Sequence, residues 1–254
     1  MTDVQLTPKV LQDLFIVNGY NLGKWGADGT WGGLTEAAVK DWFKTGHDLL
    51  NPKTKPESKE FDNKAFFDVV RAAVRGLTVS QVEGFNHVLD EWKVRGWTNT
   101  QQFAYVLATA WWESGRTMQP VREGFYISPT FAGAEAWRKR NLRYYPFYGR
   151  GLVQLTWDFN YRKASQLYGV DFIKNPDLAL DPVYSVKIIF DGMENGWFTS
   201  KSLDDYIDDM DEPDSEDLRE FVNARRIVNG TDKAADIGKL SLVFEKAIKA
   251  GNGE

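Results

Sequence analysis

The stretch FAYVLATAWW at residues 103–112 is an apolar run of helical length, and it is followed directly by Glu113, Ser114 and Gly115. Such a run predicts a buried helix, which we expect to begin at Thr98 or Thr100 and to end at Glu113. A carboxyl group at the end of a buried apolar helix loses part of its hydration and holds its proton more tightly. Glu113 is therefore a candidate general acid, with a solvated carboxylate at a helix end as the alternative.

A second carboxyl group lies ten residues further on, at Glu123 in the segment PVREGF, and residues 148–161 then read YGRGLVQLTWDFNY. Because Pro120 separates Glu123 from the apolar helix, its side chain is free to approach from another side. Two carboxyl groups that face each other suit the cleavage of a glycosidic bond by an acid and a base. Asp158 and Asp232 are alternatives for the second carboxylate, and a salt bridge with Arg122 is the non-catalytic alternative for Glu123.

Most of the remaining chain has helical periodicity. We expect further helices at residues 61–74, 81–94, 160–168, 182–195, 215–228 and 237–250. Strand signals are short and confined to residues 125–127 and 152–156. The fold class is therefore mainly α, with at most a small β-hairpin.

Composition limits the classes of function. The net charge of −5 argues against a nucleic-acid partner, which needs a concentrated basic surface. There is no cysteine, which excludes disulfides and a thiol peptidase, and with only two histidines and no HExxH motif a zinc hydrolase lacks its ligands. We therefore expect no metal and no cofactor.

The chain has no apolar run long enough to span a bilayer and no signal-peptide pattern at its start. We expect a monomer that stays in the cytoplasm of the cell that makes it until it is released towards the cell wall, without stable membrane insertion.

The N-terminal residues predict a small helical unit with an aromatic core, followed by a polar linker at 48–60. The pattern Leu11-Gln12, Gly19-Tyr20, Asp28-Gly29-x-Trp31-Gly32, Thr35, Ala38-Val39 and Trp42 resembles the peptidoglycan-binding domain of cell-wall hydrolases. This resemblance implies a three-helix wall-binding module over residues 1–47.

The rest of the chain, residues 61–254, is expected to form a second domain. From about Val79 to the C-terminus it resembles glycoside hydrolase family 19, the chitinase-like group that also supplies many phage endolysins. The resemblance depends on Tyr148-Gly149-Arg150-Gly151-Leu152-Val153-Gln154-Leu155-Thr156-Trp157, Asn160-Tyr161, Asn175-Pro176-Asp177-Leu178, Asp181-Pro182 and Arg226-Ile227-Val228-Asn229-Gly230. It implies a lysozyme-like, predominantly helical catalytic domain that inverts at the anomeric carbon. One departure is Trp112, which stands where plant members carry a histidine.

The family resemblance also implies roles for individual residues. Glu113 would be the general acid, Glu123 the general base and Thr156 the hydroxyl that holds the attacking water. The substrate-binding candidates are Gln154, Asn160 and Asn229, with Tyr148, Arg150 and Tyr161 beside them. Loop capping is the alternative for the three amides, and interior packing is the alternative for the two tyrosines. Arg122 and Arg150 are candidates to stabilise the charge of Glu123.

Together these resemblances predict a phage-type endolysin that hydrolyses β-1,4 bonds in the glycan strands of peptidoglycan and so lyses the host cell. Three alternatives stay open: a chitinase, a lytic transglycosylase that needs one carboxyl group, and a wall-binding protein without catalysis.

Overall fold

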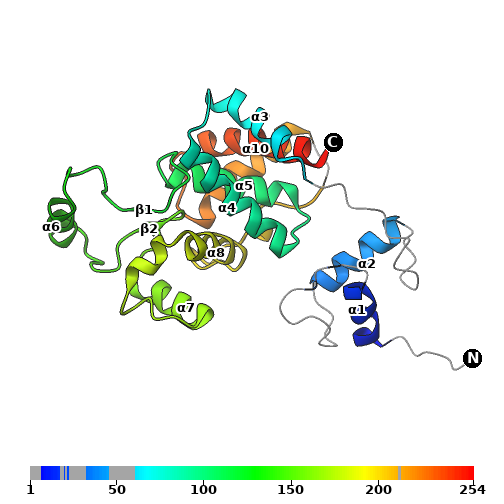
Figure 1. Ribbon diagram of the computed structural model, residues 1–254, viewed down its shortest axis with the longest axis horizontal. Coiled ribbons are helices and arrows are strands. Elements are labelled where there is room, and N and C mark those ends of the chain that lie inside the picture. Colours follow the sequence, from blue (N-terminus) through cyan, green and yellow to red (C-terminus); the bar gives the residue numbers. More distant parts are fainter. Residues whose placement is uncertain (1–6, 18–19, 21, 23–32, 46–60, 211–212) are drawn as a thin grey trace, which may run out of the picture. The chain divides into compact units, whose positions relative to one another are not determined.

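The computed structural model describes residues 7–17, 20, 22, 33–45, 61–210 and 213–254. The chain divides into two compact units, residues 1–60 with 93–98 and residues 61–92 with 99–254. The predicted linker at 48–60 and the part of the wall-binding motif at 28–32 lie outside the described residues. The described elements are helices and one two-stranded sheet (Figure 1), so the predicted, mainly helical fold class is confirmed.

The smaller unit contains α1 (Pro8–Val17) and α2 (Gly33–Thr45). Phe15 is fully buried and contacts the rings of Tyr20 and Trp42 edge to face. The Gln12 side chain donates a buried hydrogen bond of 3.0 Å to the Thr35 hydroxyl, which ties the two helices together. These contacts give a physical reason for the Gln and Thr of the N-terminal sequence pattern.

The larger unit is built around α5 (Thr100–Glu113), in which every residue from Phe103 to Trp111 is buried. The helix begins after Asn99, whose side chain accepts a hydrogen bond from the Gln102 N–H. It ends where Gly115 and Arg116 take positive φ values of 62° and 68°. The predicted end of this helix at Glu113 is confirmed.

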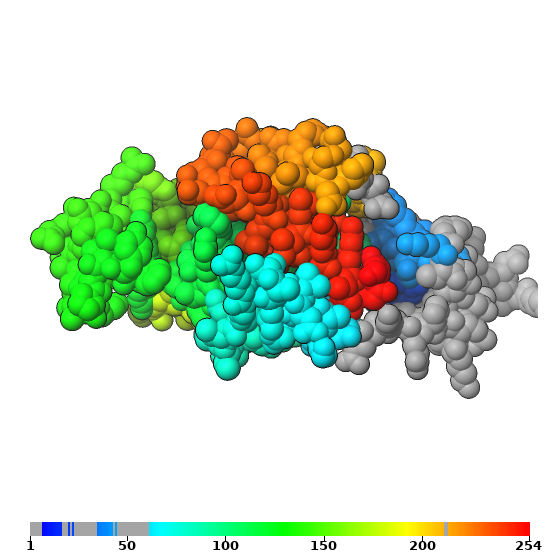
Figure 2. All heavy atoms as spheres, turned by 90° about the horizontal axis from the view of Figure 1, so that it is seen from above, coloured from blue at the N-terminus to red at the C-terminus, as the bar shows by residue number. Residues whose placement is uncertain are grey.

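A long C-terminal helix, α10 (Ala234–Asn252), packs against α5, α3 (Asn63–Val74) and α9 (Asp214–Ala224). Figure 2 shows α3 in cyan lying along the red end of α10. The other helices of this unit are α6 (Phe131–Asn141), α7 (Asp158–Tyr168), α8 (Pro182–Glu194) and most of α4 (Val79–Arg95), whose residues 93–95 are assigned to the smaller unit. Short 3₁₀ turns are η2 (Pro176–Leu180), η3 (Leu203–Asp205) and η4 (Arg225–Ile227).

The two predicted strands are wrong in position. Residues 125–127 form a turn, and the sheet pairs β1 (Val121–Arg122) with β2 (Arg150–Gly151) in antiparallel register. The apolar run at 152–156 is a tight turn because Gly151 and Gln154 have φ values of 86° and 56°. Leu152 and Leu155 are buried, and Leu155 forms a single antiparallel bridge with Arg150 that closes this turn.

Helix α6 was not predicted. It lies with β1 and β2 on one side of the larger unit, away from α3 and α10 (Figure 1). Among the described residues, no helix combines the length and the apolar character needed to cross a membrane.

Candidate active site

Glu113 lies at the end of α5 and keeps 18% of its side chain exposed. The Arg225 guanidinium donates a hydrogen bond of 2.6 Å to its Oε1 atom, and Arg225 itself is almost completely buried. Arg225 also donates to the Asp232 carbonyl at 2.9 Å, which fixes the direction of its side chain. Oε2 of Glu113 has no hydrogen-bond partner among the described residues, so this oxygen is available to a ligand.

The expected apolar surroundings of Glu113 are only part of its environment. Trp111 is buried against Phe85, with ring centres 5.8 Å apart, and Trp112 contacts the Arg116 guanidinium. The charged partner of Glu113 is Arg225, which lies 112 positions later and which no motif in the sequence connects with Glu113. A buried guanidinium stabilises a neighbouring carboxylate, so the tryptophans alone do not set the behaviour of this group.

Glu123 directly follows β1 and is held at both its backbone and its side chain. Its N–H donates to the Gly149 carbonyl at 2.7 Å, and its own carbonyl accepts from Arg138 Nε at 2.7 Å. The carboxylate accepts from the Tyr144 hydroxyl at 2.7 Å and from the Gly149 N–H at 2.9 Å. Both oxygens therefore have a donor, which fixes the orientation of the carboxylate.

Burial, together with the hydrogen bond to Glu123, raises the pKa of Tyr144 to about 12. Tyr144 consequently keeps its proton at neutral pH and acts as a donor to the carboxylate. The non-catalytic alternative for Glu123, a salt bridge with Arg122, is absent among its described contacts.

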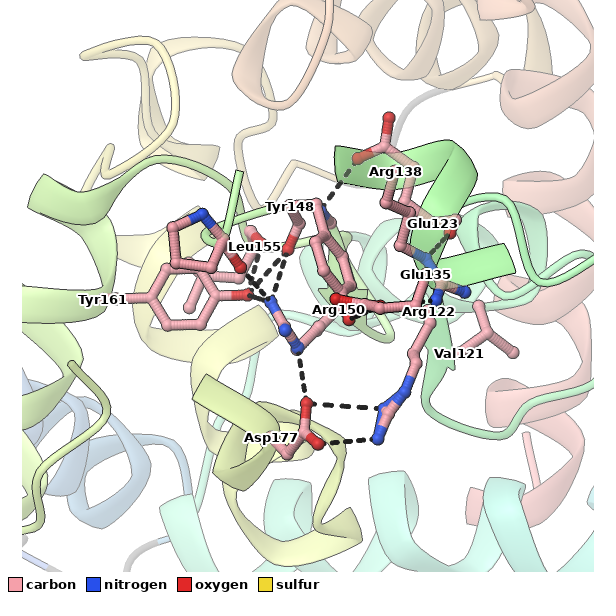
Figure 3. Close-up of polar contacts among 12 residues, drawn as sticks. Val121, Arg122, Glu123, Glu135, Arg138, Tyr148, Arg150, Leu155, Tyr161 and Asp177 are labelled. Carbon is pink, nitrogen blue, oxygen red and sulfur yellow. Dashed lines mark hydrogen bonds and ion pairs between the residues drawn. The ribbon is translucent and has the colours of Figure 1, made fainter. Parts of the chain in front are cut away.

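Arg122 and Arg150 instead both bind the carboxylate of Asp177 (Figure 3). The distances are 2.7 Å from Arg122 Nη2 to Oδ2 and 2.8 Å from Arg150 Nε to Oδ1. The suggestion that either arginine stabilises the charge of Glu123 is therefore corrected. Their shared acid lies in η2 and ties this turn to the two strands.

Arg150 is buried, and Asp177 is not its only partner. Its Nη1 donates to the Pro146 and Tyr148 carbonyls and to the Tyr161 hydroxyl. Its guanidinium carbon lies 3.7 Å from the centre of the Tyr148 ring. Tyr148 and Tyr161 are buried as well, so interior packing describes all three side chains, and direct contact of any of them with a substrate would require rearrangement.

The turn after β2 brings further predicted residues to Glu123. A Cβ added at Gly149 would lie 2.7 Å from Gln154 Oε1 and 3.2 Å from Glu123 Oε2, so these two side chains meet over a glycine that leaves them room. Gln154 donates to the Val121 and Gly151 carbonyls. Thr156 follows, and its hydroxyl donates to the Gln154 carbonyl at 3.0 Å.

Asn160 and Asn229 differ in their surroundings. Asn160 is buried and donates to the Thr156 carbonyl at 3.0 Å, while its Oδ1 has no hydrogen-bond partner among the described residues. Asn229 is exposed on the loop after η4, and its side-chain oxygen accepts from the Gly230 N–H. Its own N–H bonds to the Arg225 carbonyl, which connects this loop to the partner of Glu113.

The turns that directly follow the two glutamates contact each other. The Phe125 ring lies 3.7 Å from the position of a Cβ added at Gly115, so the turn after Glu113 touches the turn after Glu123. The structure thus gathers Glu123, Gln154 and Thr156 on one side and Glu113 with Arg225 on the other. Asp158 instead pairs with Arg162 on the exposed face of α7.

Sequence reasoning missed three supporting residues of this site: Tyr144, Arg138 and Arg225. Arg138 is 1% exposed and is held by Glu135, whose carboxylate also accepts from the Tyr148 hydroxyl. Burial acts to raise the pKa of Glu135, but hydrogen bonds from Arg138, Tyr148 and Tyr145 outweigh it and lower the pKa. Arg225 directly precedes Arg226, the first residue of a family motif, and this position was the available signal for it.

Within the described residues, no cluster of histidines and acids suits a metal ion.

Residues 122–210 match the family model described as chitinase class I. The chain contains a glycoside hydrolase family 19 domain. The matched part includes Glu123, Gln154, Thr156 and Asn160, and it begins nine residues after Glu113. The family 19 resemblance is confirmed for this part, whereas the assignment of Glu113 depends on the geometry at the end of α5.

The curated relatives of this chain include plant proteins. Endochitinase A2 of Pisum sativum is 50% identical over 42 residues, which are 16% of this chain and 13% of the relative. Inactive chitinase-like protein 1 of Hevea brasiliensis is 37% identical over 108 residues, which are 42% of this chain and 31% of the relative. Chitinase 11 of Oryza sativa subsp. japonica is 32% identical over 94 residues, which are 35% of this chain and 37% of the relative.

The chain therefore spans little more than a third of these relatives at most. No solved structure matches the chain. Because one relative is named as inactive, the family 19 fold alone does not establish turnover, and the catalytic groups must be tested in this protein.

Proposed function

We propose that this chain is a glycoside hydrolase that cleaves β-1,4 glycosidic bonds of peptidoglycan, with the role of a phage-type endolysin. The observation that carries the proposal is a pair of carboxyl groups, each directly before one of two contacting turns. The two groups have different hydrogen-bond partners. Both oxygens of Glu123 accept hydrogen bonds, whereas Glu113 accepts one and has a free oxygen. A base must be ionised and fixed, and an acid must carry a proton on an oxygen that can reach the substrate.

In the proposed reaction, the water oxygen attacks the anomeric carbon while the bond to the leaving oxygen breaks. Glu123 accepts a proton from the water, and Glu113 donates a proton from Oε2 to the leaving oxygen, while Arg225 remains bonded to Oε1. Thr156 holds the attacking water, since its hydroxyl oxygen accepts a hydrogen bond while its proton goes to the Gln154 carbonyl. Carboxyl groups of inverting glycosidases are about 6.5–9.5 Å apart, which leaves room for this water.

The choice of peptidoglycan depends on the N-terminal motif, which resembles a wall-binding domain and whose Gln12–Thr35 contact ties α1 to α2. Chitin is the second candidate substrate because the curated relatives include endochitinases. In either case the substrate is a β-1,4-linked polymer of N-acetylated sugars, and the same two carboxyl groups act.

Digestion of purified peptidoglycan and of soluble chito-oligosaccharides by the wild type, Glu113→Gln and Glu123→Gln tests the proposal. We expect mass spectrometry to find reducing N-acetylmuramic acid ends that both substitutions abolish. Anhydro ends with an active Glu123→Gln variant would indicate a lytic transglycosylase. Cleavage of chito-oligosaccharides alone would indicate a chitinase. If the wild type releases no products from either substrate, the protein binds the wall without catalysis.

A further inference from the structure

A cavity that the proposed reaction does not use lies in the larger unit, beside the end of α5. It has a volume of about 430 Å³ and is bounded by the end of α3, the start of α4, the end of α5 and the start of α10. These segments belong to the face seen in Figure 2. Its charged lining residues are Arg75, Arg116 and Asp236, and Trp112 supplies an aromatic wall. None of these side chains has a part in the proposed reaction.

Two of these charges are arginines without an acidic partner. Arg75 and Arg116 are exposed, and neither makes an ion pair with a described residue. The Arg116 guanidinium lies 5.6 Å from the centre of the Trp112 ring, a cation–π contact that holds the side chain at the cavity. The cavity therefore presents two positive charges against the single acid Asp236.

Both arginines also occupy backbone positions that favour glycine. Arg75 has φ 62° where α3 ends, and Arg116 has φ 68° after α5. The left-handed conformation costs a residue with a side chain about 1–2 kcal/mol, and glycine avoids this cost. An arginine at such a position that makes no intramolecular ion pair is a candidate to bind a ligand with its side chain.

The cavity shares a wall with the segment that carries Glu113. Trp112 immediately precedes Glu113, and the Arg116 N–H donates to the Trp111 carbonyl at 2.7 Å. The Arg116 carbonyl accepts from the Gln81 side chain at 2.7 Å. This turn is thus anchored to α4 and α5, and Arg116 follows Glu113 by three positions, so the cavity borders the segment that carries the proposed acid.

We propose that this cavity binds the acidic peptide stem that branches from the muramic acid of peptidoglycan, an inference that rests on the proposed function. Such a stem carries several carboxylates, which two arginines bind by paired hydrogen bonds. Where the stem contains a diamino acid it also carries an amine, for which Asp236 is the matching acid. Chitin has no charged branch, so the cavity distinguishes the two candidate polymers.

The test compares the wild type with the double variant Arg75→Gln/Arg116→Gln on three substrates: intact peptidoglycan, the same glycan strands stripped of peptides by an amidase, and chitohexaose. We expect kcat/KM on peptide-bearing strands to fall at least tenfold, and the rates on the two peptide-free substrates to stay within twofold. Arg140→Gln/Lys174→Gln removes the same charge from exposed positions elsewhere and should change none of the three rates. An equal loss on all substrates, or no loss on peptide-bearing strands, would overturn the proposal.

Calorimetry with the free stem tetrapeptide separates this proposal from the proposed function. The wild type should bind the tetrapeptide, the double variant should lose at least tenfold in affinity, and Asp236→Asn should weaken binding only when the side-chain amine is not acetylated. A wild type that cleaves only chito-oligosaccharides would refute the proposed function, and this binding assay would still test the cavity. No binding of the tetrapeptide by the wild type would refute the cavity as a peptide site.

Discussion

At the scale of single residues, the hydroxyl of Tyr144 orients the carboxylate of Glu123 through a bond of 2.7 Å. Hydrogen bonds to charged groups contribute about 1.5–3 kcal/mol, and each 1.4 kcal/mol corresponds to a tenfold change in rate. We expect Tyr144→Phe to lower kcat at least tenfold with little change in KM, because the base loses its orientation and the substrate contacts remain. Steady-state kinetics on a soluble glycan substrate measure this effect.

Tyr184→Phe is the matched control, since Tyr184 lies in α8 and its described contacts are to aromatic rings. An unchanged kcat in Tyr144→Phe would show that the Gly149 N–H alone suffices to hold Glu123.

Gly149 also affects the position of the Glu123 carboxylate, because its missing side chain leaves room for Glu123 and Gln154. A methyl group there would push against Gln154 Oε1, the mobile end of a side chain, and approach Glu123 Oε2. Because Gln154 can move aside, we expect Gly149→Ala to lower activity about tenfold while its melting temperature falls by only a few degrees. Gly230→Ala is the control for stability, since a Cβ at Gly230 meets nothing within 4 Å. A large loss of stability with activity retained by the folded fraction would contradict this prediction.

At the scale of elements, α9 and α10 bring two buried carboxyl groups together. Asp217 in α9 accepts a hydrogen bond of 2.8 Å from Gln101, and Glu245 of α10 lies near it. Burial, and then the charge of Glu245, raises the pKa of Asp217 to about 6. A carboxyl group with a raised pKa in the folded state takes up a proton on acidification before the unfolded chain does. The free energy of unfolding should therefore increase as the pH falls from 7 towards 5.

Asp217→Asn removes this charge and keeps an oxygen for Gln101. We expect it to raise the free energy of unfolding at pH 7 by about 2 kcal/mol, and the difference to become small near pH 4, where the folded state is protonated and the unfolded chain is about half protonated. Urea unfolding at pH 7, 5 and 4 measures the change. Asp68→Asn is the comparison, because the hydrogen bond from Lys64 lowers the pKa of Asp68 and the sign is opposite. A less stable Asp217→Asn protein at pH 7 would show that the ionised carboxylate contributes favourably.

Some of these elements could be predicted from the sequence, and others could not. Helix α5 was predictable because its long apolar run is buried, and its last residue placed Glu113. Helix α6 was not, because its buried residues are Ala134 and the charged Arg138, which leave no apolar stripe in the sequence. The strands have only two residues each and are held by the bonds of Arg122 and Arg150 to Asp177, so alternation of apolar residues could not indicate them.

The same limit applies to the site. Glu123, Gln154 and Thr156 are grouped in sequence motifs, and the structure brings them together. The partners of the two glutamates were not predictable in the same way. Arg225 reaches Glu113 from 112 residues away, and Tyr144 reaches Glu123 from a segment without helical or strand signals.

At the scale of the whole molecule, the two units have separate cores, and the proposed wall-binding role belongs to the smaller one. Phe15 is 0% exposed at the centre of the cluster with Leu22 and Ala38. Replacing a buried phenylalanine by alanine costs about 3–5 kcal/mol, and domains this small have little stability to lose. We expect Phe15→Ala to unfold the smaller unit and leave the larger one intact.

Sedimentation with purified peptidoglycan measures the consequence in the full chain, with Glu113→Gln present to prevent digestion. The Glu113→Gln protein should sediment with the wall, and adding Phe15→Ala should reduce the bound fraction several-fold. Phe15→Ala alone should still hydrolyse a soluble glycan at the wild-type rate, because that reaction requires only the larger unit. Ile16→Ala, at a 42% exposed position of the same helix, is the matched control and should bind like its parent. Equal sedimentation of all these variants would assign wall binding to the larger unit, whereas loss of soluble activity in Phe15→Ala would show that the two units do not fold independently.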